Sequence, residues 1–331
     1  MPKAVFLFLL CLTFAFSAFG CGRTNGVDTG EQSVGLAYKN GFSINYLDVG
    51  EGDAIFINFG DGKTMLIDCG EENERNLRLI EKFADFYAGD FIDYLVITHP
   101  DGDHAGNAAA IAERYGIGKA FIPYIIDVDN YGFYAHACEK IDEKGVEREY
   151  SKQFSRIEGG DYRVLFLSPR PRGTSDSAYD VFNSSLNPTA EQTNDLSPII
   201  YLDYKGVRFL FTGDAGFSQE KIVLDDYKSG CFDAFYGGVY SVNLNGIDFL
   251  KVAHHGADDA SGAEFLRELS PANAVISVCG DNRYGHPSAK TLKRVYDAKP
   301  DCKVYTTAEH GTISVRVDGN GKIIVITQAD E

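Results

Sequence analysis

The segment His99-Pro-Asp-Gly-Asp-His104 carries four potential metal ligands within six residues. It follows the apolar run Ile92–Thr98 and precedes residues 105–114, which have a helical pattern, so we place it on a turn between a buried strand and a helix. Charged groups this close together repel one another and lose hydration, and a bound divalent cation is the usual compensation. Asp and His also occur in helix-capping turns without a metal, so the segment alone leaves both interpretations open.

The same arrangement recurs along the chain. Predicted strands end at Asp68, at Asp214 and at His254-His255, and another is followed by the polar segment 280–288. At least four strands therefore end in residues that could bind metal or phosphate. Functional groups gathered at strand ends are typical of a site built on a rigid scaffold.

The order of the predicted elements indicates the fold class. Three strands between residues 42 and 70 precede a helix at 76–87, and a hairpin covers 197–214. The polar segment 168–195 is predicted to be a long surface loop. Two layers of strands with interspersed helices favour an α/β sandwich over an all-helical or barrel fold.

Length and charge limit the possible partners. The 331 residues suit one large domain or two small ones, and 31 basic against 48 acidic residues give a formal net charge of −17. Such a surface does not attract nucleic acid through its overall field. A polyanionic substrate would have to be held locally, and metal ions are the expected means.

The N-terminus has the pattern of an export signal. Residues 1–20 are predicted to be a signal peptide of the lipoprotein type, with Cys21 lipidated and residues 21–41 forming a tether. Ordinary cleavage nearby or an uncleaved anchor are the alternatives. All three place the domain outside the cytoplasm, either as a membrane-anchored lipoprotein or as a secreted protein. The five cysteines after Cys21 lack paired CxxC spacing, which disfavours a thiolate zinc site.

His99-x-Asp-x-Asp-His104 resembles the HxHxDH motif of the metallo-β-lactamase superfamily. Five further segments resemble, in the same order, the signatures of its ComEC-like group, which comprises the hydrolase domains of DNA-uptake proteins and their stand-alone relatives. These segments are Leu47–Ala54, Ile67–Gly70, Phe211–Asp214, Leu250–Gly256 and Asp281–Pro287. The resemblance covers roughly residues 42–318, and it implies a single four-layer αββα domain, here residues 42–331.

The resemblance also implies two divalent metal ions, zinc or manganese. The implied ligands are His99 and Asp101 for the first metal, Asp103, His104 and His255 for the second, and Asp214 for both. Asp101 stands where the superfamily motif has a histidine, and no histidine lies near residues 180–200, where many members supply another ligand. The first site is therefore rich in oxygen, which shifts its preference from zinc toward manganese or magnesium.

The remaining candidate residues would act around the metals. Asp68 resembles the carboxylate that orients the metal ligands in this group. By the same resemblance, His254 would be a phosphate contact or proton donor, and His286 would be a general acid on the leaving-group side. The candidates for substrate binding are Asn194, Ser197 and Arg283.

The function implied by the resemblance is metal-dependent hydrolysis by a metal-bridging hydroxide, most simply a phosphodiesterase or nuclease. Its substrate would be a phosphodiester such as short or single-stranded nucleic acid, with membrane contact only through the lipid anchor. Two alternatives remain open. One is a lactone or β-lactam hydrolase of the same fold, and the other is a non-catalytic binding lipoprotein in a DNA-uptake or surface complex.

Overall fold

The computed structural model describes residues 39–237 and 239–330, all of which lie in one compact unit. The predicted signal peptide, Cys21 and the tether up to residue 38 lie outside the described residues. Within the described ranges, no helix combines the length and the apolar character needed to cross a bilayer. The five cysteines of this part of the chain are all free.

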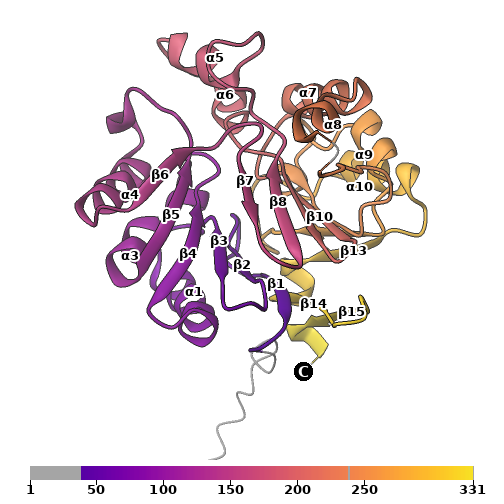
Figure 1. Ribbon diagram of the computed structural model, residues 1–331, viewed down its shortest axis with the longest axis horizontal. Helices are drawn as coiled ribbons and strands as arrows, with labels where there is room; N and C mark the ends of the chain where they lie inside the picture. The colour runs from indigo at the N-terminus through magenta and orange to yellow at the C-terminus, as the bar shows by residue number, and fades with distance from the viewer. Residues whose placement is uncertain (1–38, 238, 331) are drawn as a thin grey trace, which may run out of the picture. The chain divides into compact units, whose positions relative to one another are not determined.

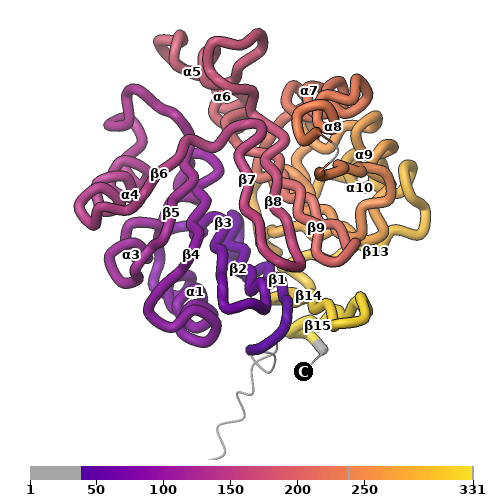
Figure 2. Tube along the Cα trace, viewed as in Figure 1, coloured from indigo at the N-terminus to yellow at the C-terminus, as the bar shows by residue number. Residues whose placement is uncertain are grey.

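The first sheet has eight strands. They are β1 (Phe42–Tyr46), β2 (Ile55–Asn58), β3 (Thr64–Ile67), β4 (Phe91–Val96), β5 (Gly116–Ile122), β6 (Glu147–Tyr150), β14 (Ile313–Val317) and β15 (Ile323–Thr327). Their order is β15-β14-β1-β2-β3-β4-β5-β6, antiparallel from β15 to β3 and parallel from β3 to β6. Figure 2 shows the yellow C-terminal strands returning to lie beside the indigo β1.

The second sheet has seven strands. They are β7 (Arg156–Glu158), β8 (Tyr162–Phe166), β9 (Ile200–Tyr204), β10 (Val207–Phe211), β11 (Phe249–Lys251), β12 (Asn273–Ile276) and β13 (Lys303–Thr306). Their order is β13-β12-β11-β10-β9-β8-β7, parallel from β13 to β10 and antiparallel from β10 to β7.

Helices cover the outer faces of both sheets (Figure 1). The α-helices are α1 (Glu74–Tyr87), α2 (Gly102–Ala105), α3 (Ala108–Arg114), α4 (Gly132–Glu143), α5 (Ala178–Ser184), α6 (Ala190–Asn194), α7 (Phe217–Lys228), α8 (Cys231–Tyr236), α9 (Ala263–Leu269), α10 (Ala289–Ala298) and α11 (Thr307–His310). The 3₁₀ turns are η1 (Val128–Asn130), η2 (Ala253–Gly256) and η3 (Gln328–Asp330).

Three apolar cores separate four layers. Strand alternation directs Ile55 and Ile57 of β2 into the core between the sheets, while Phe56 points to the core under α1, α3 and α4. A third core joins the second sheet to α7, α8, α9 and α10. This arrangement confirms the predicted αββα sandwich.

The prediction of a long surface loop at residues 168–195 is wrong, because this segment contains the helices α5 and α6. Thr189 accepts a hydrogen bond from the backbone N–H of Gln192, and the Gln192 side chain accepts one from the N–H of Thr189. This capping box satisfies two amide donors at the start of α6. The Thr-x-x-Gln spacing is a recognisable sequence signal, but the polar composition of the segment hides it.

The topology collects the predicted functional residues along one edge of the two sheets. Asp68 follows β3, the segment 99–104 follows β4, and Asp214 follows β10. His254 and His255 follow β11, and all of these strands run parallel to a neighbour. Carboxyl ends of parallel strands meet at one edge, which is where ligand sites form in open α/β sheets.

Candidate metal centre

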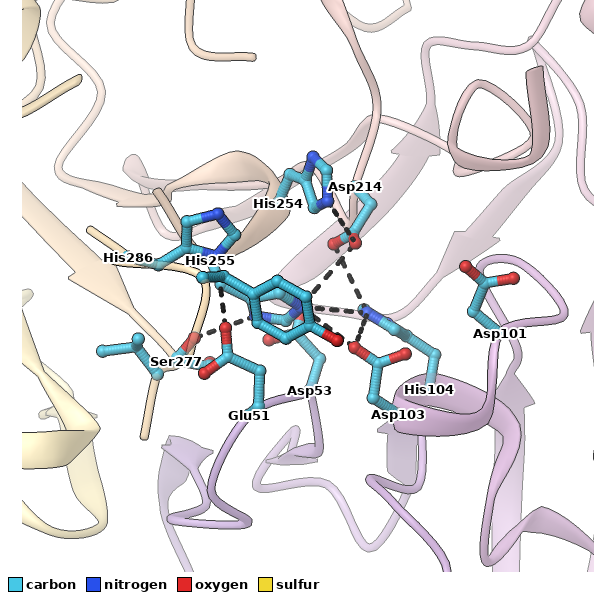
Figure 3. Close-up of polar contacts among 12 residues, drawn as sticks. Glu51, Asp53, Asp101, Asp103, His104, Asp214, His254, His255, Ser277 and His286 are labelled. Atoms are coloured by element: carbon cyan, nitrogen blue, oxygen red, sulfur yellow. Dashed lines mark hydrogen bonds and ion pairs between the residues drawn. The ribbon is translucent and has the colours of Figure 1, made fainter. Parts of the chain in front are cut away.

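Asp214 lies at the centre of the candidate site. Its carboxylate is buried, with Oδ1 3.4 Å from His104 Nε2 and Oδ2 3.6 Å from His255 Nε2. His99 Nε2 and His254 Nε2 each lie 3.9 Å from Oδ2. One carboxylate from the second sheet therefore faces imidazoles from both halves of the chain, as Figure 3 shows for three of them.

Three groups of potential ligand atoms converge among the described residues. The first consists of His99, His104 and Asp214, the second of Asp103, His104 and His255, and the third of Asp53, Asp68 and His104. In the second group, the His104 and His255 Nε2 atoms are 3.3 Å apart, and Asp103 Oδ2 is 3.5 Å from His255 Nε2. Tetrahedral ligands with metal bonds of about 2.1 Å lie about 3.4 Å from one another. The spacing of these side chains therefore fits ligands that share a cation.

Unpartnered polar atoms point to the same conclusion. Among the described residues, His99 Nε2 and Asp214 Oδ1 are buried and have no hydrogen-bond partner. A buried polar atom without a partner costs free energy, and such atoms in a native site call for an explanation such as an ion. The residues present thus fit a metal-binding role, and they could hold divalent ions.

The charge balance of the cluster favours an added cation. Burial opposes ionisation of Asp214, but the imidazoles of His104 and His255 outweigh it and hold the Asp214 pKa well below its ordinary value. Burial also lowers the His104 pKa, but the carboxylates of Asp214 and Asp68 outweigh it and raise that pKa well above its ordinary value. Burial and the neighbouring His104 lower the pKa of His99 to about 4. The carboxylates therefore draw positive charge into the cluster, as protons or as metal.

Asp101 lies at the edge of the cluster. Its Oδ2 is 3.8 Å from His99 Nε2, and Figure 3 shows it apart from the other labelled side chains. Burial, with the neighbouring carboxylates of Asp103 and Asp214, raises the pKa of Asp101 to about 6. Asp101 thus lies beside His99, and its role as a ligand of the first metal stays a prediction.

A set of buried partners holds the ligand side chains in place. Asp68 accepts hydrogen bonds from the Thr98 N–H at 2.8 Å and the Thr98 hydroxyl at 2.7 Å, and it pairs with His104 Nδ1 at 2.8 Å. His255 Nδ1 lies 2.9 Å from the Ser277 carbonyl oxygen, which turns its Nε2 toward the cluster. These contacts fix the orientation and tautomer of the ligands.

We predict that Asp68→Asn weakens metal binding by about 10- to 100-fold. The amide has a single acceptor oxygen, so it cannot satisfy Thr98 and His104 together. Isothermal titration with Mn²⁺ and Zn²⁺ would measure the change in affinity. Asp93→Asn is the matched control, because Asp93 accepts from the Thr64 N–H at the opposite end of β3 and β4. An unchanged affinity in Asp68→Asn would contradict this role.

The backbone at the His-His turn is strained. His254 and His255 have φ values of 50° and 51°, a region that non-glycine residues rarely adopt. The strain aims His255 at the metal cluster and brings His254 Nε2 to 3.4 Å from Asn194 Nδ2. The other ring nitrogen of His254, Nδ1, lies 2.8 Å from Asp259 Oδ1. Asp259 was not predicted from the sequence.

The cluster opens into a cavity of about 960 Å³. Its described lining includes seven carboxylates: Glu51, Glu71, Glu72, Asp101, Asp103, Asp214 and Asp281. The described lining residues include two arginines, of which Arg75 is paired with Asp48 at 2.6 Å and Arg283 stacks over Tyr284. An anionic substrate would therefore find little attraction in this cavity without metal ions.

The predicted substrate contacts fall in two environments. Asn194, His254, His286 and Arg283 line the cavity. Ser197 is fully buried instead, with its hydroxyl 3.2 Å from His99 Nδ1 and accepting from the Asp214 N–H at 3.2 Å. We therefore propose that Ser197 supports the two ligands rather than contacting substrate.

The chain matches the family model described as the metallo-beta-lactamase superfamily over residues 47–280. It belongs to the metallo-β-lactamase superfamily. The match spans the strand ends from β2 to β12 that carry the site, where His/Asp clusters could hold metal ions.

Curated relatives confirm the predicted similarity to the ComEC-like group. The chain is 27% identical over 290 residues to ComE operon protein 3 of Bacillus subtilis, covering 82% of this chain and 33% of that protein. It is 24% identical over 281 residues to Recombination protein 2 of Haemophilus influenzae, covering 84% of this chain and 29% of that protein. The chain thus spans about a third of the length of these relatives.

Solved structures resemble the chain more distantly. One is Igni18, described as a metallo hydrolase from Ignicoccus hospitalis, with 16% identity and a TM-score of 0.45. The similarity covers 82% of this chain and 98% of that structure.

Proposed function

We propose that the protein is a metal-dependent phosphodiesterase whose substrate class is short or single-stranded nucleic acid. One observation carries the proposal: the buried Asp214 carboxylate has nitrogen atoms of four histidines within 3.9 Å, and its Oδ1 lacks a hydrogen-bond partner among the described residues. This arrangement suits a carboxylate shared by two cations.

The proposed ligands follow from these distances. His99, Asp101 and Asp214 would hold one cation, and Asp103, His104, His255 and Asp214 the other. Bound cations would lower the pKa of water so that hydroxide forms near neutral pH, and they would offset charge developing on the phosphoryl oxygens. The Asp68–His104 and Ser277–His255 contacts keep the imidazoles directed at the cluster throughout the reaction.

Other residues would handle the substrate. His254 is held through Nδ1 by Asp259, and its Nε2, which contacts Asn194, would face a phosphoryl oxygen of a substrate bound in the cavity. Arg283 is the cavity arginine that is not ion-paired with a neighbouring carboxylate in the described part of the chain, so we propose it as a phosphate contact. The acidic lining disfavours long duplex DNA, because closely spaced phosphates would meet carboxylates.

The names of two relatives support a nucleic-acid substrate, because one is named as a recombination protein and the other as a competence protein. We further propose that the apolar N-terminal segment directs export and that a lipid on Cys21 anchors the protein to a membrane.

The test is hydrolysis by the purified protein after metal removal and reloading with Mn²⁺ or Zn²⁺. The substrates would be bis(p-nitrophenyl) phosphate, single- and double-stranded DNA, a β-lactam and a lactone. We expect metal-dependent cleavage of the phosphodiester, with single-stranded DNA cleaved faster than duplex. Cleavage of only the β-lactam or lactone would contradict the proposal, and metal binding without any hydrolysis would indicate a binding protein instead.

A further inference from the structure

A carboxylate from the N-terminal half of the chain contacts the imidazole of His286. Glu51, on the loop between β1 and β2, places Oε1 3.2 Å from His286 Nδ1, 235 residues away in sequence. Its second oxygen, Oε2, accepts a hydrogen bond from the Cys279 N–H at 3.2 Å. The side chain of Glu51 is 18% exposed and that of His286 is 15% exposed. Both line the cavity beside the cluster of potential metal ligands (Figure 3).

The loop that carries His286 has its own support. The Asn282 amide donates to the carbonyl oxygens of Cys279 at 2.8 Å and His286 at 2.7 Å, and its oxygen accepts from the His286 N–H at 2.9 Å. Asn282 therefore holds the backbone of residues 279–286, and the imidazole is left to be oriented by side chains. Tyr284 stacks on one face of the ring, with centroids 5.6 Å apart, and Glu51 binds its Nδ1 edge.

We propose that Glu51 is a positioning residue that orients His286 for proton transfer to the leaving group. The inference rests on the proposed phosphodiesterase function. It assigns a role to a residue for which the sequence motifs implied none. A carboxylate at Nδ1 accepts the N–H of that nitrogen whether the ring is neutral or charged, so the ring keeps one orientation and Nε2 is the nitrogen that gains and gives up the transferred proton.

The proton balance of the step is simple. As the phosphorus–oxygen bond to the leaving group breaks, its electron pair goes to the leaving oxygen, which takes the proton from His286 Nε2. Water supplies hydroxide to phosphorus, and the proton released from that water returns His286 to its charged form through solvent. The sum is one water added across one phosphodiester bond, giving an alcohol and a phosphomonoester. Glu51 keeps its charge throughout and touches no reacting atom.

Glu51→Gln tests the contact with His286, because the amide lacks the negative charge of the carboxylate whichever hydrogen bond it keeps. Glu51 uses both oxygens as acceptors, and glutamine has only one, so the variant loses a hydrogen bond either to His286 or to Cys279. Asn282 still holds the loop in the variant. The matched control is Glu149→Gln, because Glu149 is also a partly exposed carboxylate in a hydrogen bond, to Ser155 at 2.5 Å, but lies on the edge strand β6.

The kinetic experiment compares two leaving groups with the full-length, metal-loaded protein. A thymidine dinucleotide releases an alkoxide that needs a proton, whereas bis(p-nitrophenyl) phosphate releases a stable phenolate. Glu51→Gln should lower kcat for the dinucleotide by about 100-fold with KM nearly unchanged, and affect the nitrophenyl ester by less than about threefold. His286→Gln should match it, and the double variant should be no slower than His286→Gln alone.

An independent readout needs no turnover. Long-range ¹⁵N–¹H spectra of the imidazoles, with His286 assigned through His286→Gln, should show an Nδ1-bound proton in the wild type. That signal should change in Glu51→Gln and stay the same in Glu149→Gln.

The outcomes separate this inference from the proposed function. An unchanged His286 signal in Glu51→Gln, equal slowing of both substrates, or additive effects in the double variant would each overturn the role of Glu51. A wild-type protein that hydrolyses neither substrate would overturn the proposed function and the proton transfer with it, while the spectra would still establish whether the pair exists.

Discussion

Asp214→Asn should lower kcat/KM for phosphodiester hydrolysis by at least about 1,000-fold, equivalent to about 4 kcal/mol of transition-state stabilisation. Asp214 faces His104 through Oδ1, and His99 and His255 through Oδ2, so it is the ligand that both metals would share. An amide cannot supply a second anionic oxygen, so one cation is lost or displaced. Steady-state kinetics at saturating Mn²⁺ would measure the effect.

The control for Asp214→Asn is again Asp93→Asn, which removes a carboxylate at the opposite end of the strands. Circular dichroism and thermal unfolding should show that both variants fold. If the activity of Asp214→Asn stays within tenfold of the wild type, the mechanism does not depend on this carboxylate.

Lys251→Met should lower the free energy of unfolding by about 3–5 kcal/mol. Lys251 Nζ lies 2.7 Å from Asp53 Oδ2, and both side chains are at most 2% exposed. Removing the lysine leaves the Asp53 carboxylate buried without its cation, which is far more costly than losing an exposed pair. Urea unfolding with a shared m-value would measure the difference.

Two comparisons make the Lys251 prediction specific. The double variant Asp53→Asn/Lys251→Met removes both charges and should recover part of the loss. Lys293→Met breaks the exposed pair with Asp297 and should change stability far less. If Lys251→Met costs no more than Lys293→Met, the buried pair is not a structural tie between the two sheets.

The Lys251–Asp53 pair also bears on the site. Asp53 donates its backbone N–H to the Asp103 carbonyl oxygen at 3.2 Å. The preceding residue, Gly52, has φ +114°, and a Cβ there would lie 2.2 Å from the same oxygen. The loop between β1 and β2 therefore approaches the ligand segment closely, and the buried pair holds it against β11.

The sequence predicted the fold class and most of the cluster because their signals are local. Apolar runs mark the buried strands, and the ligands of the segment 99–104 are adjacent in sequence. Asp214 and His255 could be placed because each directly follows an apolar strand in a recognisable motif. The carboxyl ends of parallel strands meet at one edge of a sheet, so motifs that follow these strands are expected to lie close together.

The residues that escaped prediction act through packing between distant segments. The contact of Glu51 with His286 joins residues 235 positions apart, and no spacing rule marks it. The burial of Ser197 against His99 depends on how the two sheets face each other. The left-handed backbone of His254 and His255 runs against local preference and persists only because the surrounding structure fixes it.

Anomalous X-ray diffraction from crystals soaked in Mn²⁺ or Zn²⁺ would show whether the cluster binds two divalent cations. We expect two peaks, one among His99, Asp101 and Asp214 and the other among Asp103, His104, His255 and Asp214. A single peak away from Asp214, or none at millimolar metal, would contradict this expectation.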